Sequence, residues 1–417
     1  MSTDWASRTS GSSSRETTIV VMYQRLGPYH VARLTRANEF LRQQGARLVV
    51  FETAAQEGVY EWDEIRVPVP FDRKTLFPGE HYGAVNRRRL RETTAARLGT
   101  VEPDVVVVCG WSPPEGLAAL AWCRERGRAA VFLSDTKFDD APRKWWREAV
   151  KRRIVLLGDA ALVAGSASRE YIVSLGMGKG RVFEGCDVVD NVFFAEGAAA
   201  VRGAGGLGPR PPGVPDGPCF LASNRFIPRK NLARLVEAYA RYRGVVGGEA
   251  WGLVLLGDGP ERPVLDAQIA ESVPGGVLFP GFRQIDELPA YYALAACFVH
   301  PALQDQWGLV VNEAMACGLP VLVSRAAGCA ADLVAEGENG WTFDPTSVDE
   351  MAAALVRMHR LPHADRQAMG ERGRKIIGDW GLDRYARGLW HAAQAALEHA
   401  SGRKPGLSWI GRLLLKR

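Results

Sequence analysis

Short runs of apolar residues alternate with helical segments along most of this chain of 417 residues, and this alternation restricts the fold more than any other feature. The runs cover residues 18–22, 48–51, 104–108, 130–133, 160–163, 219–222, 252–256, 277–279, 297–300 and 321–324. Strands without polar alternation are typical of parallel sheets that helices cover on both faces. The sequence therefore predicts an α/β protein with Rossmann-like, doubly wound parallel sheets.

Length and composition indicate two domains of this kind. A chain of 417 residues is long for one hydrophobic core, and the composition shifts to Ala, Gly and Pro between Ala195 and Gly217, as in a linker. The expected parts are a disordered Ser/Thr-rich leader (1–16), a first domain (17–194), a linker (195–217), a second domain (218–382), a helix crossing back to the first domain (383–400) and a basic apolar tail (401–417).

The composition favours a cytoplasmic protein that does not bind nucleic acid. A net charge of +5 is too small to indicate a nucleic-acid partner. Apolar runs are too short to span a bilayer. Seven scattered cysteines without CxxC spacing fit free thiols in a reducing compartment. A DxD run at a strand end is absent, so no metal is expected.

The stretch that begins at Asp305 reads as an acid in a loop, a helix, and a helix stop at Gly318. A helix start beside a parallel sheet offers backbone N–H groups, here those of Gly308 and Leu309, to a phosphate. Glu313 lies roughly 7–8 Å along the axis from the helix start, which suits a ribose attached to the phosphates. Acids on both sides of a phosphate site suggest a nucleotide at one end and a polyol at the other.

A basic turn follows the strand at 219–222 and carries Arg225 and Lys230. A guanidinium and an ammonium on one turn can hold a diphosphate from two sides and neutralise the charge of a departing nucleoside diphosphate. A basic turn is by itself as often a plain surface feature. Its place at the carboxyl edge of the sheet, where the loop of Asp305 should also open, favours the binding site.

These segments resemble the retaining, GT-B-fold glycosyltransferases of family 4, also called glycosyl transferases group 1. The acid-x7-acid signature of that family is matched at Trp307, Gly308, Glu313, Gly318 and Pro320. Asp305 stands where the first Glu is usual, and Gln306 where Gly is common. The resemblance is strong over about 219–345 and vaguer before residue 187.

The resemblance implies transfer of a sugar, without metal or cofactor, from a nucleoside diphosphate sugar to a hydroxyl acceptor in glycan, glycolipid or polysaccharide biosynthesis. The implied roles are Arg225 and Lys230 on the diphosphate, Asp305 on the donor sugar, Glu313 on the ribose, Gly308 and Leu309 on phosphate, backbone groups at Phe282 and Arg283 on the base, and Gly27 in the loop facing the donor. Two alternatives stay open: a sugar-nucleotide epimerase or hydrolase, and a non-catalytic sugar-nucleotide-binding module.

The first domain is expected to bring the acceptor. Tyr29, His30 and Arg33 follow its first strand and are acceptor-side candidates, although a histidine at a helix start is more often structural. Asp135 follows the strand at 130–133, where many relatives have a His. An acid there can orient the acceptor hydroxyl or accept its proton. The alternative, an N-cap for the next segment, is equally compatible with the sequence.

The segment 143–153 combines tryptophans with basic residues. At helical spacing it predicts one face with Trp145, Trp146, Ala149 and Val150 and an opposite face with Arg143, Lys144, Arg147 and Lys151. Together with the tail 407–417, this helix can rest on the anionic inner surface of a membrane and bring the protein to a lipid-linked acceptor. The favoured alternative is a helix packed on the core by its tryptophans, with a solvated basic face.

Overall fold

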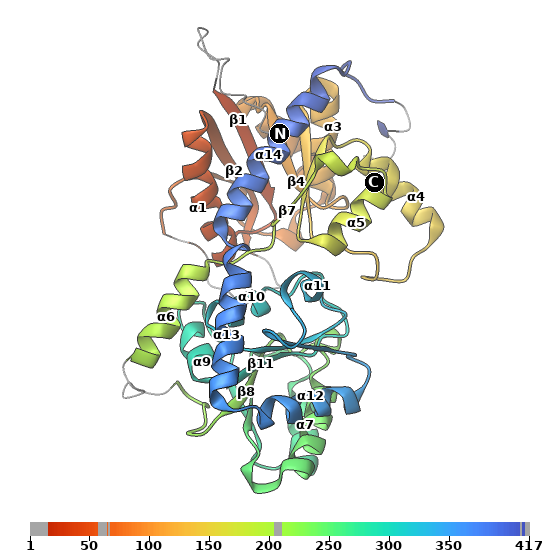
Figure 1. Cartoon of the computed structure of the whole chain (residues 1–417). Helices are drawn as coiled ribbons and strands as arrows, with labels where there is room; N and C mark the ends of the chain where they lie inside the picture. Colours follow the sequence, from red (N-terminus) through yellow and green to blue (C-terminus); the bar gives the residue numbers. More distant parts are fainter. Residues whose placement is uncertain (1–15, 57–64, 66, 204–210, 409–410, 413–417) are drawn as a thin grey trace, which may run out of the picture.

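The computed structural model describes residues 16–56, 65, 67–203, 211–408 and 411–412, which form two α/β domains (Figure 1). The first sheet has seven parallel strands in the order β3-β2-β1-β4-β5-β6-β7. They are β1 (Thr17–Tyr23), β2 (Ala46–Gln56), β3 (Asp72–His81), β4 (Val105–Cys109), β5 (Ala129–Ser134), β6 (Ala160–Val163) and β7 (Val182–Glu184). The helices of this domain are α1 (Pro28–Gln43), α2 (Arg87–Val101), α3 (Pro114–Arg126), α4 (Trp145–Val155) and α5 (Ser166–Ser174), with 3-10 turns η1 (Tyr82–Ala84) and η2 (Lys179–Arg181).

The second sheet has six parallel strands in the order β10-β9-β8-β11-β12-β13. They are β8 (Cys219–Ser223), β9 (Gly252–Leu256), β10 (Val277–Gly281), β11 (Cys297–His300), β12 (Val321–Ser324) and β13 (Gly340–Phe343). Its helices are α7 (Leu232–Val246), α8 (Arg262–Ser272), α9 (Leu288–Leu294), α10 (Leu309–Ala316), α11 (Ala330–Leu333), α12 (Val348–Arg360) and α13 (His363–Gly378), with η3 (Pro228–Lys230) and η4 (Gly247–Glu249).

The predicted fold class is confirmed, and each predicted apolar run is a strand of one of the two sheets. Strands β3, β7 and β13 were not predicted from the sequence. The edge strand β3 is largely polar and half-exposed, so it has no apolar run to reveal it. Strands β7 and β13 are only three and four residues long.

The segment between the domains differs from the predicted linker. Helix α6 (Asn191–Gly203) continues through residues 195–203, because this Ala-rich stretch favours a helix and buries Phe194 and Ala198 on the side of α9 and α10. Residues 204–210 lie outside the described part of the chain, and residues 211–217 are not helical.

After α13 the chain continues into α14 (Leu382–Ser401), which packs against α1 and against β5, β6 and β7 of the first sheet (Figure 1). The Tyr385 hydroxyl lies 3.1 Å from that of Tyr23 at the end of β1. The predicted leader lies outside the described residues except for Glu16, as do residues 409–410 and 413–417 of the predicted tail. None of the described helices has the length and apolar character needed to cross a bilayer.

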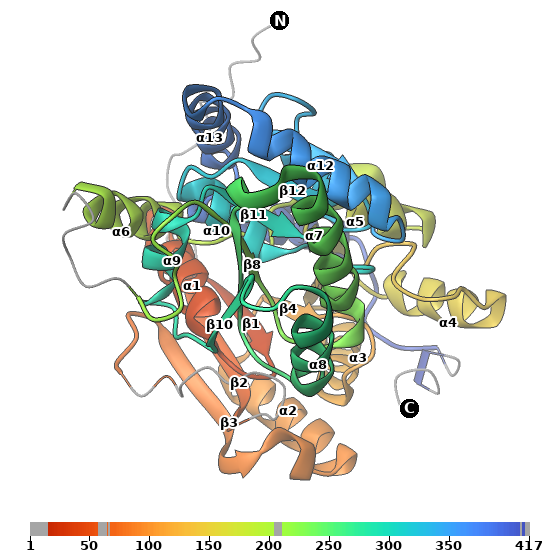
Figure 2. The ribbon, with the colours of Figure 1, turned by 90° about the horizontal axis from the view of Figure 1, so that it is seen from below.

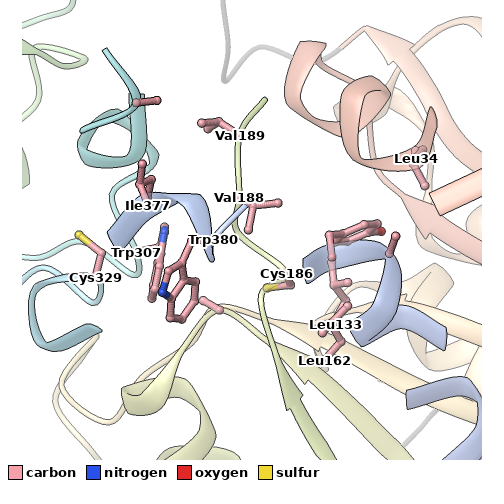
Figure 3. Packing of buried hydrophobic residues seen from close by; sticks show 14 of the residues in the cluster. Leu34, Leu133, Leu162, Cys186, Val188, Val189, Trp307, Cys329, Ile377 and Trp380 are labelled. Atoms are coloured by element: carbon pink, nitrogen blue, oxygen red, sulfur yellow. The ribbon is translucent and has the colours of Figure 1, made fainter. Parts of the chain in front are cut away.

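The two domains share a continuous apolar core. Trp307 of the second domain packs against Trp380, with ring centroids 4.9 Å apart, beside Val188 in the segment that leaves the first domain (Figure 3). The Ser166 hydroxyl at the start of α5 donates to Asp332 of α11 at 3.0 Å. These contacts fix the loops at the carboxyl ends of the first sheet against those of the second.

Candidate functional site

The candidate site lies where the strand order of the second sheet reverses, between β8 and β11. The chain runs from β8 toward one edge of the sheet and from β11 toward the other. The loops at the carboxyl ends of these two strands therefore separate and form a crevice. The loop after β8 leads into η3 and ends at Lys230, and the loop after β11 contains Asp305. The topology thereby brings together two residues that are 75 positions apart in the chain.

Lys230 and Asp305 form a largely buried ion pair, with 2.5 Å between Nζ and Oδ2. His300, the last residue of β11, has Nε2 at 2.9 Å from the same oxygen. Burial alone would raise the pKa of Asp305, but the Lys230 ammonium and the His300 hydrogen bond hold it well below its ordinary value. Burial lowers the pKa of His300, so a neutral imidazole donates to an ionised carboxylate. The pair places a cation and an anion together at the crevice.

Helix α10 begins beside this pair, at the position that the sequence predicted. Gly308 precedes it with φ +109°, and a Cβ there would lie 3.3 Å from His300 Nε2, so a glycine suits both the backbone and the space. No described side chain caps the helix, which leaves its first N–H groups for an anion. The predicted stop is also confirmed: α10 ends at Ala316, and Gly318 has φ +77°.

The backbone around Asp305 is held by the loop that follows β12. Asp305 and Ala327 pair as an isolated parallel bridge, and the Gly328 N–H donates to the Asp305 carbonyl at 3.0 Å. A Cβ at Gly328 would lie 1.8 Å from the Gln306 carbonyl oxygen. Only a glycine therefore allows the two loops to approach this closely, and that approach fixes the position of Asp305.

Glu313 is completely buried on α10, and a tyrosine hydroxyl donates to each of its two oxygens. Tyr292 of α9 donates at 2.7 Å, and Tyr29 of α1 in the first domain donates at 2.8 Å. Burial raises the pKa of Glu313 to about 7, although both hydrogen bonds oppose this shift. The Tyr29 hydrogen bond thereby joins α1 of the first domain to α10 of the second.

The raised pKa of Glu313 predicts a pH-dependent difference between the wild type and Glu313→Gln. The folded protein keeps a proton that the unfolded chain has lost between about pH 4.5 and 7, so this group's contribution to the free energy of unfolding falls as the pH rises through that window. Across it, the wild type should lose up to about 3 kcal/mol relative to Glu313→Gln. Urea denaturation at pH 5 and pH 8 measures this, with the exposed Glu271→Gln as control. If the free energy of unfolding changed with pH equally in the wild type and in Glu313→Gln, the raised pKa of Glu313 would be contradicted.

Asp135 faces the second domain across the crevice. Gln306 Nε2 donates to Asp135 Oδ1 at 3.2 Å. Burial, followed by the negative charge of Asp187, raises the pKa of Asp135 to about 7, which suits exchange of a proton near neutral pH. The N-cap alternative is wrong, because α4 begins only at Trp145.

Arg33 is buried rather than open to an acceptor. Its side chain donates to the Val188 carbonyl at 2.7 Å and to Asp187 at 3.2 Å, and so it fixes the segment that leaves the first domain. Nη2 lacks a partner among the described residues. Asp187 was not predicted from the sequence, because it lies in a short loop and its partner Arg33 comes from α1.

His30 holds the backbone of the first loop through a hydrogen bond. His30 Nδ1 accepts from the Gly27 N–H at 3.0 Å. Burial, with a smaller effect of the Arg33 charge, lowers the pKa of His30 to about 3 and keeps it neutral. The Leu26 N–H donates to Glu52, a buried acid of β2 that was not predicted from the sequence.

The remaining donor-side candidates lie on the loops after β8 and β10. Arg225 is half-buried on the turn that leads to η3. Arg283 donates to the Pro280 carbonyl at 2.8 Å and to Glu287 at 3.1 Å, so its side chain braces its own loop, next to the half-buried Phe282. Three-member groups of His, Cys, Asp or Glu that could hold a metal ion do not occur among the described residues.

Part of the chain is similar in sequence to known glycosyltransferases. Residues 210–376 match the family model described as glycosyl transferases group 1. A GDP-mannose-dependent alpha-(1-6)-phosphatidylinositol monomannoside mannosyltransferase of Mycolicibacterium smegmatis is 32% identical over 201 residues, which is 46% of this chain and 50% of that protein. A sulfoquinovosyl transferase of Arabidopsis thaliana is 33% identical over 150 residues, 35% of this chain and 27% of that protein. The match thus spans half or less of these relatives' length.

Solved structures match over nearly the whole chain. Sucrose-phosphate synthase of Thermosynechococcus elongatus superposes with a TM-score of 0.68 at 20% identity and covers 90% of this chain and 98% of its own. Anabaena HepE in complex with UDP and glucose gives a TM-score of 0.67 at 17% identity, with coverage of 90% and 98%. The chain therefore has the GT-B fold, and its residues 210–376 match the glycosyl transferases group 1 family.

Proposed function

We propose that this protein is a retaining glycosyltransferase of family 4 that transfers a sugar from a nucleoside diphosphate sugar to a hydroxyl acceptor in the cytoplasm. One observation carries the proposal: the Lys230–Asp305 pair lies at the switch point of the second sheet, beside the uncapped start of α10. A cation, free helix N–H groups and a carboxylate at one crevice suit a diphosphate bonded to a polyol.

The donor is held from several sides in this proposal. Lys230 and Arg225 bind the diphosphate together with the N–H groups at Gly308 and Leu309. As the bond between the anomeric carbon and the diphosphate oxygen breaks, these groups stabilise the charge that develops on the leaving group. The cations supply what a metal ion supplies in other transferases, so we expect turnover to persist in the presence of EDTA.

The sugar and the acceptor meet between the domains. Asp305, ionised by its contacts with Lys230 and His300, accepts hydrogen bonds from donor-sugar hydroxyls. Asp135 accepts a hydrogen bond from the acceptor hydroxyl on the opposite side. The acceptor oxygen bonds to the anomeric carbon on the face that the diphosphate leaves, and the departing phosphate takes the proton. Catalysis then consists mainly of positioning and electrostatic stabilisation.

An assay of nucleoside diphosphate release tests this function. The relatives named above include a GDP-mannose-dependent enzyme and a protein solved with UDP and glucose, so both UDP- and GDP-sugars are the donors to try. We expect release that depends on an added hydroxyl acceptor, and a product whose anomeric configuration by NMR is that of the donor. Release or epimerisation without acceptor would instead indicate a hydrolase or epimerase, and donor binding without turnover a binding module.

A further inference from the structure

Helix α4 carries an exposed apolar surface at the edge of the first domain. Nine large apolar side chains are exposed in the described residues, and four of them lie between positions 138 and 156. They are Phe138 (63% exposed), Trp145 (83%), Trp146 (46%) and Leu156 (49%). Figures 1 and 2 both show α4 at the periphery of the domain. The expectation that the tryptophans pack on the core is therefore wrong.

The basic residues of this segment do not form one solvated face as predicted: some contact the domain and others are exposed. Arg143 turns inward, with its guanidinium 4.4 Å from the centre of the Tyr171 ring and Nη1 3.0 Å from the Tyr171 hydroxyl. Lys151 donates to the same hydroxyl at 2.9 Å and to Glu148 at 2.9 Å. These inward contacts, with Ile154 and Val155 buried in the core, hold α4 firmly while its outer face stays exposed.

The outer face mixes apolar and basic side chains at helical spacing. Trp145, Arg152 and Leu156 follow one another at i, i+7 and i+11, which aligns them along a single stripe. Trp146 and Arg153 lie about 100° further round the helix, and both are exposed. Lys144 and Arg147 are exposed as well, whereas the single acid of α4, Glu148, is engaged by Lys151. The surface therefore has a net positive charge.

We propose that this surface, called here the α4 face (Phe138, Lys144, Trp145, Trp146, Arg147, Arg152, Arg153 and Leu156), docks on the anionic surface of a lipid bilayer. Tryptophan rings partition into the interfacial region of a bilayer, and neighbouring Lys and Arg side chains attract anionic headgroups while their stems cover apolar surface. Basic charge around exposed tryptophans fits this partner better than a second copy of a chain that is itself positively charged.

The α4 face is connected to the crevice. The segment between Asp135 and Trp145 runs from the site to the start of α4, and the Gln304 side chain donates to the Asp140 carbonyl within it. A protein docked through α4 thus holds Asp135 near the lipid surface, where a lipid-linked acceptor would arrive. This consequence rests on the proposed function, whereas docking itself does not.

Flotation of the full chain with vesicles tests the proposal. We expect binding to vesicles made of equal parts phosphatidylglycerol and phosphatidylcholine, weakening with added NaCl, and little binding to phosphatidylcholine alone. Arg152→Ser/Arg153→Ser should weaken binding about 25-fold, because each basic residue near an anionic surface contributes about fivefold. Trp145→Ser/Trp146→Ser should weaken it at least about tenfold.

The matched control is Arg87→Ser/Arg88→Ser, which removes the same charge from α2, a helix without exposed large apolar residues. We expect it to change binding by no more than about twofold. Absence of binding to the anionic vesicles, or equal binding by the tryptophan variant, would overturn the proposal. The proposal would also be overturned if sedimentation velocity showed a dimer and if Trp145→Ser/Trp146→Ser abolished that dimer without changing vesicle binding. Vesicle binding needs no turnover, so its failure is distinguishable from failure of the proposed function.

Discussion

Replacement of Lys230 by alanine should reduce turnover roughly a thousandfold or more. The substitution removes the cation that faces the diphosphate and leaves the buried Asp305 carboxylate beside His300 without its ammonium partner. The negative charge of Asp305 then opposes the charge that grows on the leaving group. Steady-state kinetics with the donor that supports transfer measure the effect. The loss should appear in kcat, since the interaction is strongest when the leaving group carries its full charge.

Two comparisons separate this effect from unfolding. Arg241→Ala removes an exposed cation from α7, the helix that follows η3, and should leave turnover within about twofold of wild type. Lys230→Arg keeps the charge in another geometry and should recover part of the loss. If Lys230→Ala turned over at a near-normal rate with every donor tried, the role of this residue would be refuted.

Asp305→Asn should lower kcat/KM about a hundredfold or more. The amide keeps the size of the side chain but removes the charge that holds Lys230 and that accepts hydrogen bonds from His300 and from the donor sugar. Lys230 is then free to take other positions, so both the diphosphate and the sugar lose orientation. Steady-state kinetics with the sugar donor measure the loss of transfer. A separate titration with the nucleoside diphosphate shows whether diphosphate binding is weakened as well.

Glutamate at this position gives a second comparison. Asp305→Glu restores the charge with one more methylene, so it should retain more activity than Asp305→Asn if the charge matters most. Asp266→Asn, an exposed change on α8, serves as control and should be neutral. Equal activity of Asp305→Asn and wild type would show that Asp305 only supports the loop.

The strands and the donor loop could be predicted because their information is local. Apolar runs such as Cys297–His300 mark buried parallel strands directly, and Gly308 and Gly318 mark the ends of α10. Exposure of the α4 tryptophans could not be predicted, since helical periodicity separates two faces but does not say which one meets the core. Here Arg143 and Lys151 donate hydrogen bonds to Tyr171 of α5, so part of the predicted basic face meets the domain and the tryptophans are exposed.

The contacts between the site residues could not be predicted from the sequence for a similar reason. Lys230 was assigned to the diphosphate and Asp305 to the donor sugar. Their direct contact was not predicted, because these residues are 75 positions apart in the chain and meet only because β8 and β11 are adjacent. His300 reads in the sequence as an ordinary end of a strand. Tyr292 occupies an apolar position of α9. The hydrogen bond from its hydroxyl to Glu313 depends on the packing of α9 against α10, which the sequence does not show.

Isothermal titration of UDP, GDP and ADP tests the central claim most directly, because every assigned role depends on a diphosphate bound between η3 and the start of α10. We predict that at least one of the three binds the wild type with a measurable Kd, and that Lys230→Ala weakens this binding at least about tenfold. Failure of all three nucleotides to bind the folded wild-type protein would contradict the account.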